Sequence, residues 1–425
     1  MLKDYRSLLL YLFKWGIIAI CIGCLSGLAS AFFLKSLAWA GDFRSDHLWL
    51  IWLLPIAGFC VGALYYYFGK SVEGGNNQLL DEIHNPQKIV PLKMAPLVLF
   101  GTVVSHFFGA SVGREGTAVQ MGGSIADQFS RFKFINTEDR RIILIIGIAA
   151  GFSSVFGTPL AGAIFGLEVY LLGKMNYKAI FPSFVGAITA NYIGEISLHA
   201  MHGKHTNYII PEVAEMNLLN LGLAVAAGLL FGITARCFSG AALHFGNYLN
   251  KFIKYPPAKP LIGGLIIAIL FTLLGTDRYM GLGVPVIEEA FVQHVEYHDF
   301  ILKLLFTTFC LGAGYKGGEV TPLFFVGATL GNVLSLFIPL PMALLAGMGF
   351  VAVFSGAANT PIATIFMGIE LFGHEAGVFI AIACVVSYLS SGHSGIYKKQ
   401  KIGSSKQPSF THEEGEILQN IKRLK

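Results

Sequence analysis

Two acidic residues stand in glycine-rich segments of the same pattern, about half a chain apart. Glu115 lies in GREGT (residues 113–117) and Glu319 lies in GGEVT (residues 317–321). Together with the residues that follow, both segments fit the pattern G-x-E-x-T-x5-G. Each opens an apolar stretch. A carboxylate among the backbone amides of such a turn can bind a proton, or can take the place of an anion on the same donors. The pattern therefore indicates a pathway that couples protons to anions.

Three segments have the form of a glycine-rich turn that opens a short helix: residues 74–77, 113–117 and 317–321. The first amides of a helix lack partners within it and lie at the positive end of its dipole, so they can hold an anion without a full positive charge. Glycine lets the backbone approach the ion closely. The predicted anion-binding residues are Gly75, Asn76, Asn77, Gly113, Arg114, Gly116, Val320 and Thr321.

Glu115 is the residue that we expect to exchange an anion for a proton. Ionised, its carboxylate can occupy the anion site itself, and protonated it gains nothing there and should swing out. The alternative is a capping glutamate paired with Arg114 at a helix start. Arg114 is expected in either case to balance local charge rather than to bind the transported ion.

The composition places these motifs in a membrane. The chain has 425 residues, of which 54% are hydrophobic and 13% are charged, with a mean hydropathy of +0.63. A soluble domain carries about 25% charged residues, so a polytopic, all-α membrane protein is predicted. A net charge of +5, carried mostly by loops and ends, does not indicate nucleic-acid binding. Six cysteines scattered through apolar runs and an ordinary aromatic content call for neither a metal nor a cofactor.

Helices and repeats follow from the apolar runs. Residues 8–34 and 47–68 are long enough to cross a hydrocarbon core of about 30 Å, which takes roughly 20 helical residues. A second motif, Thr-Pro followed by a glutamate, ends at Glu168 and again at Glu370. Its two copies are separated by nearly the same number of residues as the two copies of the first motif. We expect these two glutamates to be helix-end or interface residues. The predicted units are a first membrane repeat (1–205), a second repeat (206–395) and a basic cytoplasmic tail without a regulatory domain, in part disordered (396–425).

The chain ends indicate the orientation. Lys3 and Arg6 precede the first helix, and Lys398, Lys399 and Lys401 follow the last. By the positive-inside rule both termini are predicted to be cytoplasmic.

Three histidines, His199, His202 and His205, are spaced by three residues near the predicted boundary between the repeats. Metal ligation is one interpretation. The other, which we favour, is a solvated loop without a metal.

Residues 113–123 (GREGTAVQMGG) resemble the signature of the CLC chloride channel and transporter family, G-R-E-G-P followed by Q-x-G-G. Residues 147–168, Pro322 and Tyr397 extend the resemblance to about residues 10–400. It implies a homodimer in the lipid bilayer with one pathway per subunit, and two inverted-topology repeats of tilted and broken helices. It also implies that Glu115 is the gating glutamate and Tyr397 the pore-lining tyrosine.

The departures from the family pattern point to one branch. Asn76 stands where the usual G-S-G-I-P-E has serine, and residues 318–322 (GEVTP) replace the usual G-x-F-x-P. Together they resemble the CLC branch of fluoride/proton antiporters. Fluoride is small, strongly hydrated and a good acceptor, so the amide of Asn76 or Asn77 and the hydroxyls of Thr321 and Tyr397 would supply the donors that desolvating it requires.

The resulting prediction is a fluoride/proton antiporter of a bacterial inner membrane, which expels fluoride as protons enter and so confers fluoride resistance. Glu319 is interpreted as a second proton-coupled glutamate; a surface pair with Lys316 is the alternative. A chloride/proton exchanger or passive chloride channel of the same fold is the competing function. An enzyme is not expected, because no catalytic constellation is present apart from the three histidines.

Overall fold

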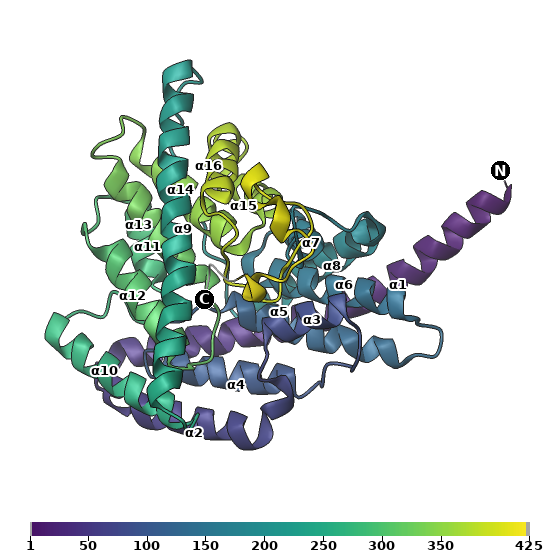
Figure 1. Ribbon diagram of the computed structural model, residues 1–425, viewed down its shortest axis with the longest axis horizontal. Helices are drawn as coiled ribbons and strands as arrows, with labels where there is room; N and C mark the ends of the chain where they lie inside the picture. The colour runs from purple at the N-terminus through teal and green to yellow at the C-terminus, as the bar shows by residue number, and fades with distance from the viewer. Residues whose placement is uncertain (1, 422–425) are drawn as a thin grey trace.

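The computed structural model describes the backbone of residues 2–421 and the side chains of residues 5–421, so the side chain of Lys3 and the last four residues lie outside it. The chain folds into helices with a single two-stranded sheet among these residues (Figure 1). The predicted all-α class is confirmed.

The first half contains α1 (Leu2–Asp46), η1 (Leu48–Leu53), α2 (Leu54–Phe68), η2 (Lys70–Val72), α3 (Asn76–His84), α4 (Met94–Phe107), α5 (Glu115–Ala126), η3 (Asp127–Arg131), α6 (Thr137–Phe156), α7 (Pro159–Glu168), β1 (Leu171–Leu172), η4 (Tyr177–Ala179) and α8 (Ile180–Ala200). The second half contains α9 (Leu218–Phe252), α10 (Ala258–Leu274), α11 (Val284–Val292), α12 (Asp299–Gly312), α13 (Val320–Leu334), α14 (Met342–Ala358), α15 (Pro361–Phe372) and α16 (Gly377–Ser390). The tail adds β2 (Lys401–Ile402), η5 (Pro408–Glu413) and η6 (Leu418–Asn420).

Within the described residues, three helical segments are long and apolar enough to cross a membrane: Tyr5–Asp46, Leu48–Phe68 and Leu218–Phe252. Figure 1 shows α1 and α9 running in different directions across the bundle. Seven further apolar helices among the described residues have only 10–17 residues and are shorter than a membrane span. Short helices that end inside a bundle leave amides and carbonyls there that need partners, and the site below is built from such ends.

Two long apolar runs each divide into two helices. The run at 142–172 breaks after α6 at Gly157, which has φ +77°, and Pro159 then opens α7. The run at 361–389 breaks at Gly373, with φ +92°. Helix α11 was not expected from the sequence, because its nine residues include two glutamates and give too short a periodic pattern.

The two central helices of the bundle, α6 and α14, are buried along nearly their whole length. Each packs on its neighbour through glycines. A Cβ added at Gly122 of α5 would lie 2.3 Å from the carbonyl oxygen of Gly147 in α6, and one added at Gly327 of α13 would lie 2.0 Å from that of Gly349 in α14. The corresponding helix pairs of the two halves therefore approach at backbone contact distance.

The second motif places α7 and α15 antiparallel to each other. Glu168, the last residue of α7, accepts hydrogen bonds from the amides of Ile362 (3.2 Å) and Ala363 (2.9 Å) in the first turn of α15. Glu370, near the end of α15, accepts from the amides of Leu160 (2.9 Å) and Ala161 (2.8 Å) in the first turn of α7. The expected helix-end role of both glutamates is confirmed, and the reciprocal contacts fit inverted repeats.

The tail is folded as far as it is described, so the prediction of partial disorder is wrong for residues 396–421. Strand β2 pairs in parallel with β1, which follows α7. Gln400 donates to the carbonyls of Val169 (2.8 Å) and Ala358 (3.2 Å), and Ile396 N donates to Ala357 O at 2.9 Å. These long-range backbone contacts, which no local pattern reveals, fix the segment that carries Tyr397.

Candidate functional site

The two copies of the first motif touch each other. Gly113 and Gly318 form an isolated antiparallel bridge, in which the amide of Gly318 donates to the carbonyl of Gly113 at 2.7 Å. Helix α5 starts two residues after Gly113 and α13 starts two residues after Gly318. The first turns of these helices therefore meet inside the bundle, one from each half.

Glu115 is fully buried at this junction. One carboxylate oxygen accepts the backbone amide of Thr321 at 3.0 Å, and the other accepts the Thr321 hydroxyl. The amide of Arg114 donates at 3.1 Å, and the Arg114 guanidinium contacts the carboxylate at 3.4 Å. The amide of Thr321 belongs to the first turn of α13, where it has no partner within the helix. The carboxylate thus occupies a site that suits an anion, and the Arg114 contact of the alternative interpretation is also present.

The third glycine-rich segment joins the same junction. Helix α3 begins at Asn76 after Gly75, whose φ of +55° favours glycine. A Cβ added at Gly116 would lie 2.9 Å from Asn76 Nδ2, 3.2 Å from the Cα of Gly318 and 3.8 Å from Glu319 Oε2. Glycine at position 116 therefore leaves open the space that these groups surround. All three predicted helix starts are confirmed.

A first cavity, of about 250 Å³, reaches this junction beside the tail. We call it the tail-side cavity. It is lined by Gly75, Asn76, Asn77, Lys316, Glu319 and Tyr397, among others. Asn77 does more than line it, because its side-chain oxygen accepts the amide of Lys399 at 3.0 Å. That bond ties the start of α3 to the segment that presents Tyr397.

A second cavity, of about 20 Å³, reaches the junction beside the loop that connects α8 to α9. We call it the loop-side cavity. Its polar lining consists of Arg114, Glu115, His205, Thr206, Tyr208 and Thr321. The two cavities share no lining residue, yet residues of the paired motifs contribute to both. The motif copies therefore stand between two spaces.

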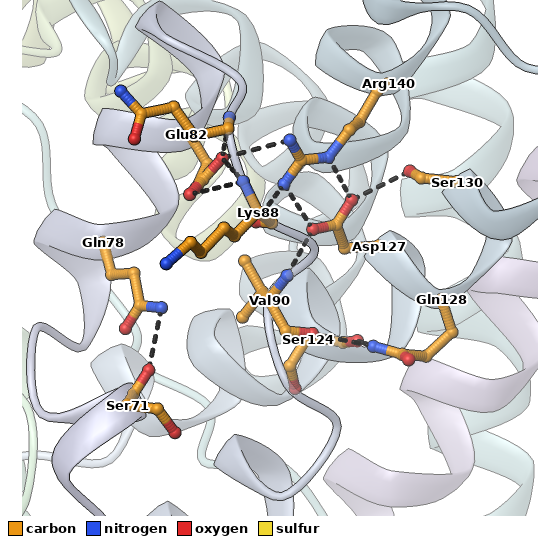
Figure 2. A network of polar contacts seen from close by, with 11 residues as sticks. Ser71, Gln78, Glu82, Lys88, Val90, Ser124, Asp127, Gln128, Ser130 and Arg140 are labelled. Carbon is orange, nitrogen blue, oxygen red and sulfur yellow. Dashed lines mark hydrogen bonds and ion pairs between the residues drawn. The ribbon is translucent and has the colours of Figure 1, made fainter.

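A buried ionic network holds α3, α5 and α6 together behind the junction (Figure 2). Arg140 donates to both carboxylate oxygens of Asp127 at 2.8 Å, contacts the Glu82 carboxylate at 3.0 Å and donates to the carbonyl of Lys88 at 2.7 Å. Asp127 also accepts the amide of Val90 at 2.7 Å. Since Glu82 lies near the end of α3, Arg140 on α6 and Asp127 just after α5, the network fixes how α3 and α5 sit relative to each other.

The predicted site residues come together at this junction. Asn76, Glu115, Glu319, Thr321 and Tyr397 line one cavity or the other. Gly113 and Gly116 form the close backbone contacts, and Val320 is buried at the first position of α13.

Glu319 and Lys316 do not form the surface pair of the alternative interpretation. No ion pair joins them within residues 5–421, and both line the tail-side cavity. The Lys316 ammonium instead lies 4.0 Å from the centre of the Tyr65 ring. Glu319 is therefore a cavity residue.

The three histidines separate in space. No group of three His, Cys, Asp or Glu side chains that could hold a metal is found in the described part of the chain. His199 and His202 are exposed, whereas His205 lines the loop-side cavity next to Glu115. Sequence reasoning placed all three in a boundary loop, which is wrong for His199, because this residue lies in the last turn of α8. It also did not identify His205, Thr206 or Tyr208 as neighbours of the site. Nothing in the local pattern marks a loop that folds back onto a distant helix start.

Comparison with known proteins shows what the chain resembles. The model of the voltage gated chloride channel family matches residues 57–392. A protein of Pseudomonas syringae pv. tomato named chloride/fluoride channel protein is 53% identical over 409 residues, which are 95% of this chain and 90% of that protein. An H(+)/Cl(−) exchange transporter of Vibrio cholerae is 25% identical over 390 residues, covering 83% of this chain and 81% of its own length.

Solved structures give the same picture. The crystal structure of a CLC-type fluoride/proton antiporter superposes with a TM-score of 0.87 at 34% identity, over 92% of this chain and 98% of the other. A slow cyanobacterial Cl−/H+ antiporter superposes with a TM-score of 0.77 at 22% identity, which speaks for the fold alone.

Proposed function

The chain belongs to the voltage-gated chloride channel (CLC) family, whose fold it shares, and we propose that it is a fluoride/proton antiporter of that family. It is an anion and proton transporter embedded in a membrane. The finer proposal rests above all on one observation: the carboxylate of Glu115 occupies the first-turn donors of α13, beside Asn76 and Glu319.

The proposed cycle exchanges one occupant of those donors for another. Fluoride enters from one cavity and displaces the Glu115 carboxylate from the amide and hydroxyl of Thr321. The displaced carboxylate takes up a proton, because it has lost the donors that favoured its ionised form. The protonated side chain then releases its proton toward the side of the membrane opposite to the one from which the proton came. The carboxylate returns to Thr321, and fluoride leaves.

The donors at the junction suit fluoride. In this proposal Asn76 Nδ2, the amides around Gly116, the Thr321 hydroxyl and the Tyr397 hydroxyl replace the water that fluoride sheds. Glu319 acts as a second proton-coupled group: protonated it donates to the anion, and ionised it repels it. Arg114 balances the charge of the Glu115 carboxylate.

Direction and setting complete the proposal. Both termini face the cytoplasm of a bacterium, as their lysines and arginines predict. The protein lies in the inner membrane as a homodimer and exports fluoride as protons enter. The division into two repeats, residues 1–205 and 206–395, and a cytoplasmic tail, residues 396–425, is kept as part of this proposal. The tail-side cavity then opens to the cytoplasm and the loop-side cavity to the outside.

Purified protein in liposomes tests the proposal. Vesicles are loaded with fluoride or with chloride, and anion efflux and proton uptake are followed together. We expect fluoride efflux to drive proton uptake and to exceed chloride efflux. Equal efflux of the two anions would contradict fluoride selectivity. Fluoride efflux without proton uptake would instead support a passive channel, the function that the name of the Pseudomonas relative suggests.

A further inference from the structure

The loop between α8 and α9 covers Glu115 on the side away from the tail. Residues 201–217 connect the two halves, and the part from His205 to Tyr208 lines the loop-side cavity together with Glu115 and Thr321. A simple linker between two repeats has no need to reach the site. The position of this one suggests that it takes part in transport.

Aromatic packing anchors the loop in this position. The ring of Tyr208 packs against those of Phe291 and Phe350, with centroids 5.4 and 5.2 Å away, and against Phe372 at 6.3 Å. The side chain of Ile210 approaches Gly347 so closely that a Cβ there would lie 2.6 Å from it. The loop is thus attached to α11, α14 and α15, and its position at the cavity that Glu115 also lines is part of the fold.

His205 has a hydrogen-bonding atom without a partner in this cavity. Its Nε2 is buried and forms no hydrogen bond with another described residue. The imidazole lies against Gly157, where a Cβ would be 3.3 Å from Cδ2. The residue as a whole is only partly buried, so part of it is accessible to solvent.

The cavity between these groups has the size and polarity for one water molecule. Its volume of about 20 Å³ exceeds the roughly 10–15 Å³ that a water needs. The Glu115 carboxylate, the Thr321 hydroxyl and His205 Nε2 can each bond to such a water. A water in this cavity would connect the carboxylate to the imidazole.

We propose that His205 transfers protons between Glu115 and the aqueous phase on the loop side, an inference that rests on the proposed antiport. A proton from outside binds one ring nitrogen, and the proton on the other nitrogen passes through the bridging water to the Glu115 carboxylate. The imidazole begins and ends neutral, with its proton moved to the other nitrogen, and reorientation of the ring restores the starting arrangement before the next transfer. No redox step or further reactant is required.

The electrostatic surroundings agree with a neutral relay. Burial, and the nearby Arg114 guanidinium to a smaller degree, lower the pKa of the His205 imidazole to about 4. Because a lowered pKa means that the charged form is lost as the pH rises through about 4, the ring is neutral at pH 7 and can accept a proton at one nitrogen and release one from the other. The groups that face it are Arg114, Glu115 and Tyr208.

Removal and chemical replacement of the imidazole test the inference. In liposomes, His205→Ala should slow fluoride-coupled proton uptake by at least about tenfold, since positioned proton transfer contributes about 10²- to 10⁴-fold. Imidazole added on the loop side should restore the rate, a result that lost packing alone would not produce. His205→Gln, which fills more of the space but cannot take up and release a proton, should be slow at unchanged fluoride affinity.

The matched control is His202→Ala, three residues away and exposed, which should exchange like the unaltered protein. Normal exchange by His205→Ala, or slow exchange that imidazole does not accelerate, would overturn the inference while leaving antiport intact. Absence of coupled exchange in the unaltered protein would instead overturn the proposed function, and the inference with it.

Discussion

The carboxylate of Glu115, from the first half, accepts both the backbone amide and the hydroxyl of Thr321, from the second half. The two residues lie 206 positions apart in the sequence. The first half supplies the carboxylate and the donors of Arg114, and the second half supplies the donors of Thr321. The unit of function, as we propose it, is therefore the contact between the two copies of the motif.

Glu115→Gln should abolish coupling. The amide retains the shape of the side chain and one acceptor oxygen, but it cannot alternate between a carboxylate and an acid. Fluoride flux should become independent of an imposed pH gradient, and proton uptake should fall to background. Simultaneous fluoride-electrode and pH recordings on liposomes measure both. Intact coupled exchange in this variant would show that Glu115 does not carry the proton.

Thr321→Val should slow fluoride exchange by roughly 10- to 100-fold, because a hydrogen bond to a charged group contributes about 1.5–3 kcal/mol. The methyl group keeps the volume and removes only the hydroxyl. Thr321→Ser, which keeps the hydroxyl, is the matched control and should stay within a few-fold of the unaltered rate. Initial rates of fluoride efflux provide the comparison, and equal rates for the two variants would exclude the hydroxyl as a donor.

Gly116→Ala should block transport of both ions. The added Cβ would lie 2.9 Å from Asn76 Nδ2, in the space between the three helix starts. Gly222→Ala is the control, since Gly222 lies in the helix α9 with nothing within 4 Å of the added carbon. That change should leave transport unaltered. Comparable fluoride fluxes in both variants would mean that ions do not pass Gly116.

Arg140→Met should destabilise the protein by about 3–5 kcal/mol, because removing one partner of a buried ion pair leaves the other charge uncompensated. The side chains of Arg140 and Asp127 are 10% and 0% exposed. The adjacent Arg141→Met breaks a pair with Glu138 whose side chains are 35% and 66% exposed, and should cost less than about 1 kcal/mol. Thermal unfolding in detergent distinguishes them, and similar losses would contradict a structural role of the network.

Glu168→Ala should destabilise the protein more than Glu370→Ala. Both carboxylates accept two helix amides, but Glu168 is nearly fully buried whereas Glu370 is partly exposed. Leaving buried amides without acceptors costs about 1–3 kcal/mol, and water can replace the acceptor more readily at the exposed site. Glu195→Ala, at an exposed position of α8, should be neutral in the same unfolding experiment. A larger loss for Glu370→Ala would contradict this order.

The sequence predicted the helix starts of the site well, because glycine, acidic residues and threonine at fixed spacing report on the local backbone. Helices α3, α5 and α13 begin at Asn76, Glu115 and Val320, each within one of the glycine-rich segments. From the two copies of the motif the sequence predicted a pathway, but not their direct contact. Spacing along a chain does not show which helix ends meet.

The features that were missed depend on contacts between distant segments. The network of Arg140 and Asp127 joins three elements, and Arg140 in the sequence is one basic residue among several near a helix end. His205 lines the same cavity as Glu115 because the neighbouring Tyr208 packs against Phe291, which lies far away in the sequence. The folded tail likewise depends on β1, 230 residues before β2.

The reciprocal caps of α7 and α15 indicate how such a protein can arise by duplication of one half. Each half contains one helix start that needs an acceptor and one glutamate that provides it, and the two needs are met only across the pair. A single half inserted into a membrane in both orientations could make the same two caps with an inverted copy of itself. Gene fusion would then have joined two chains that already fitted, and later divergence in one copy alone, such as Val320 where the first copy has Gly116, could alter the ion without disturbing the frame.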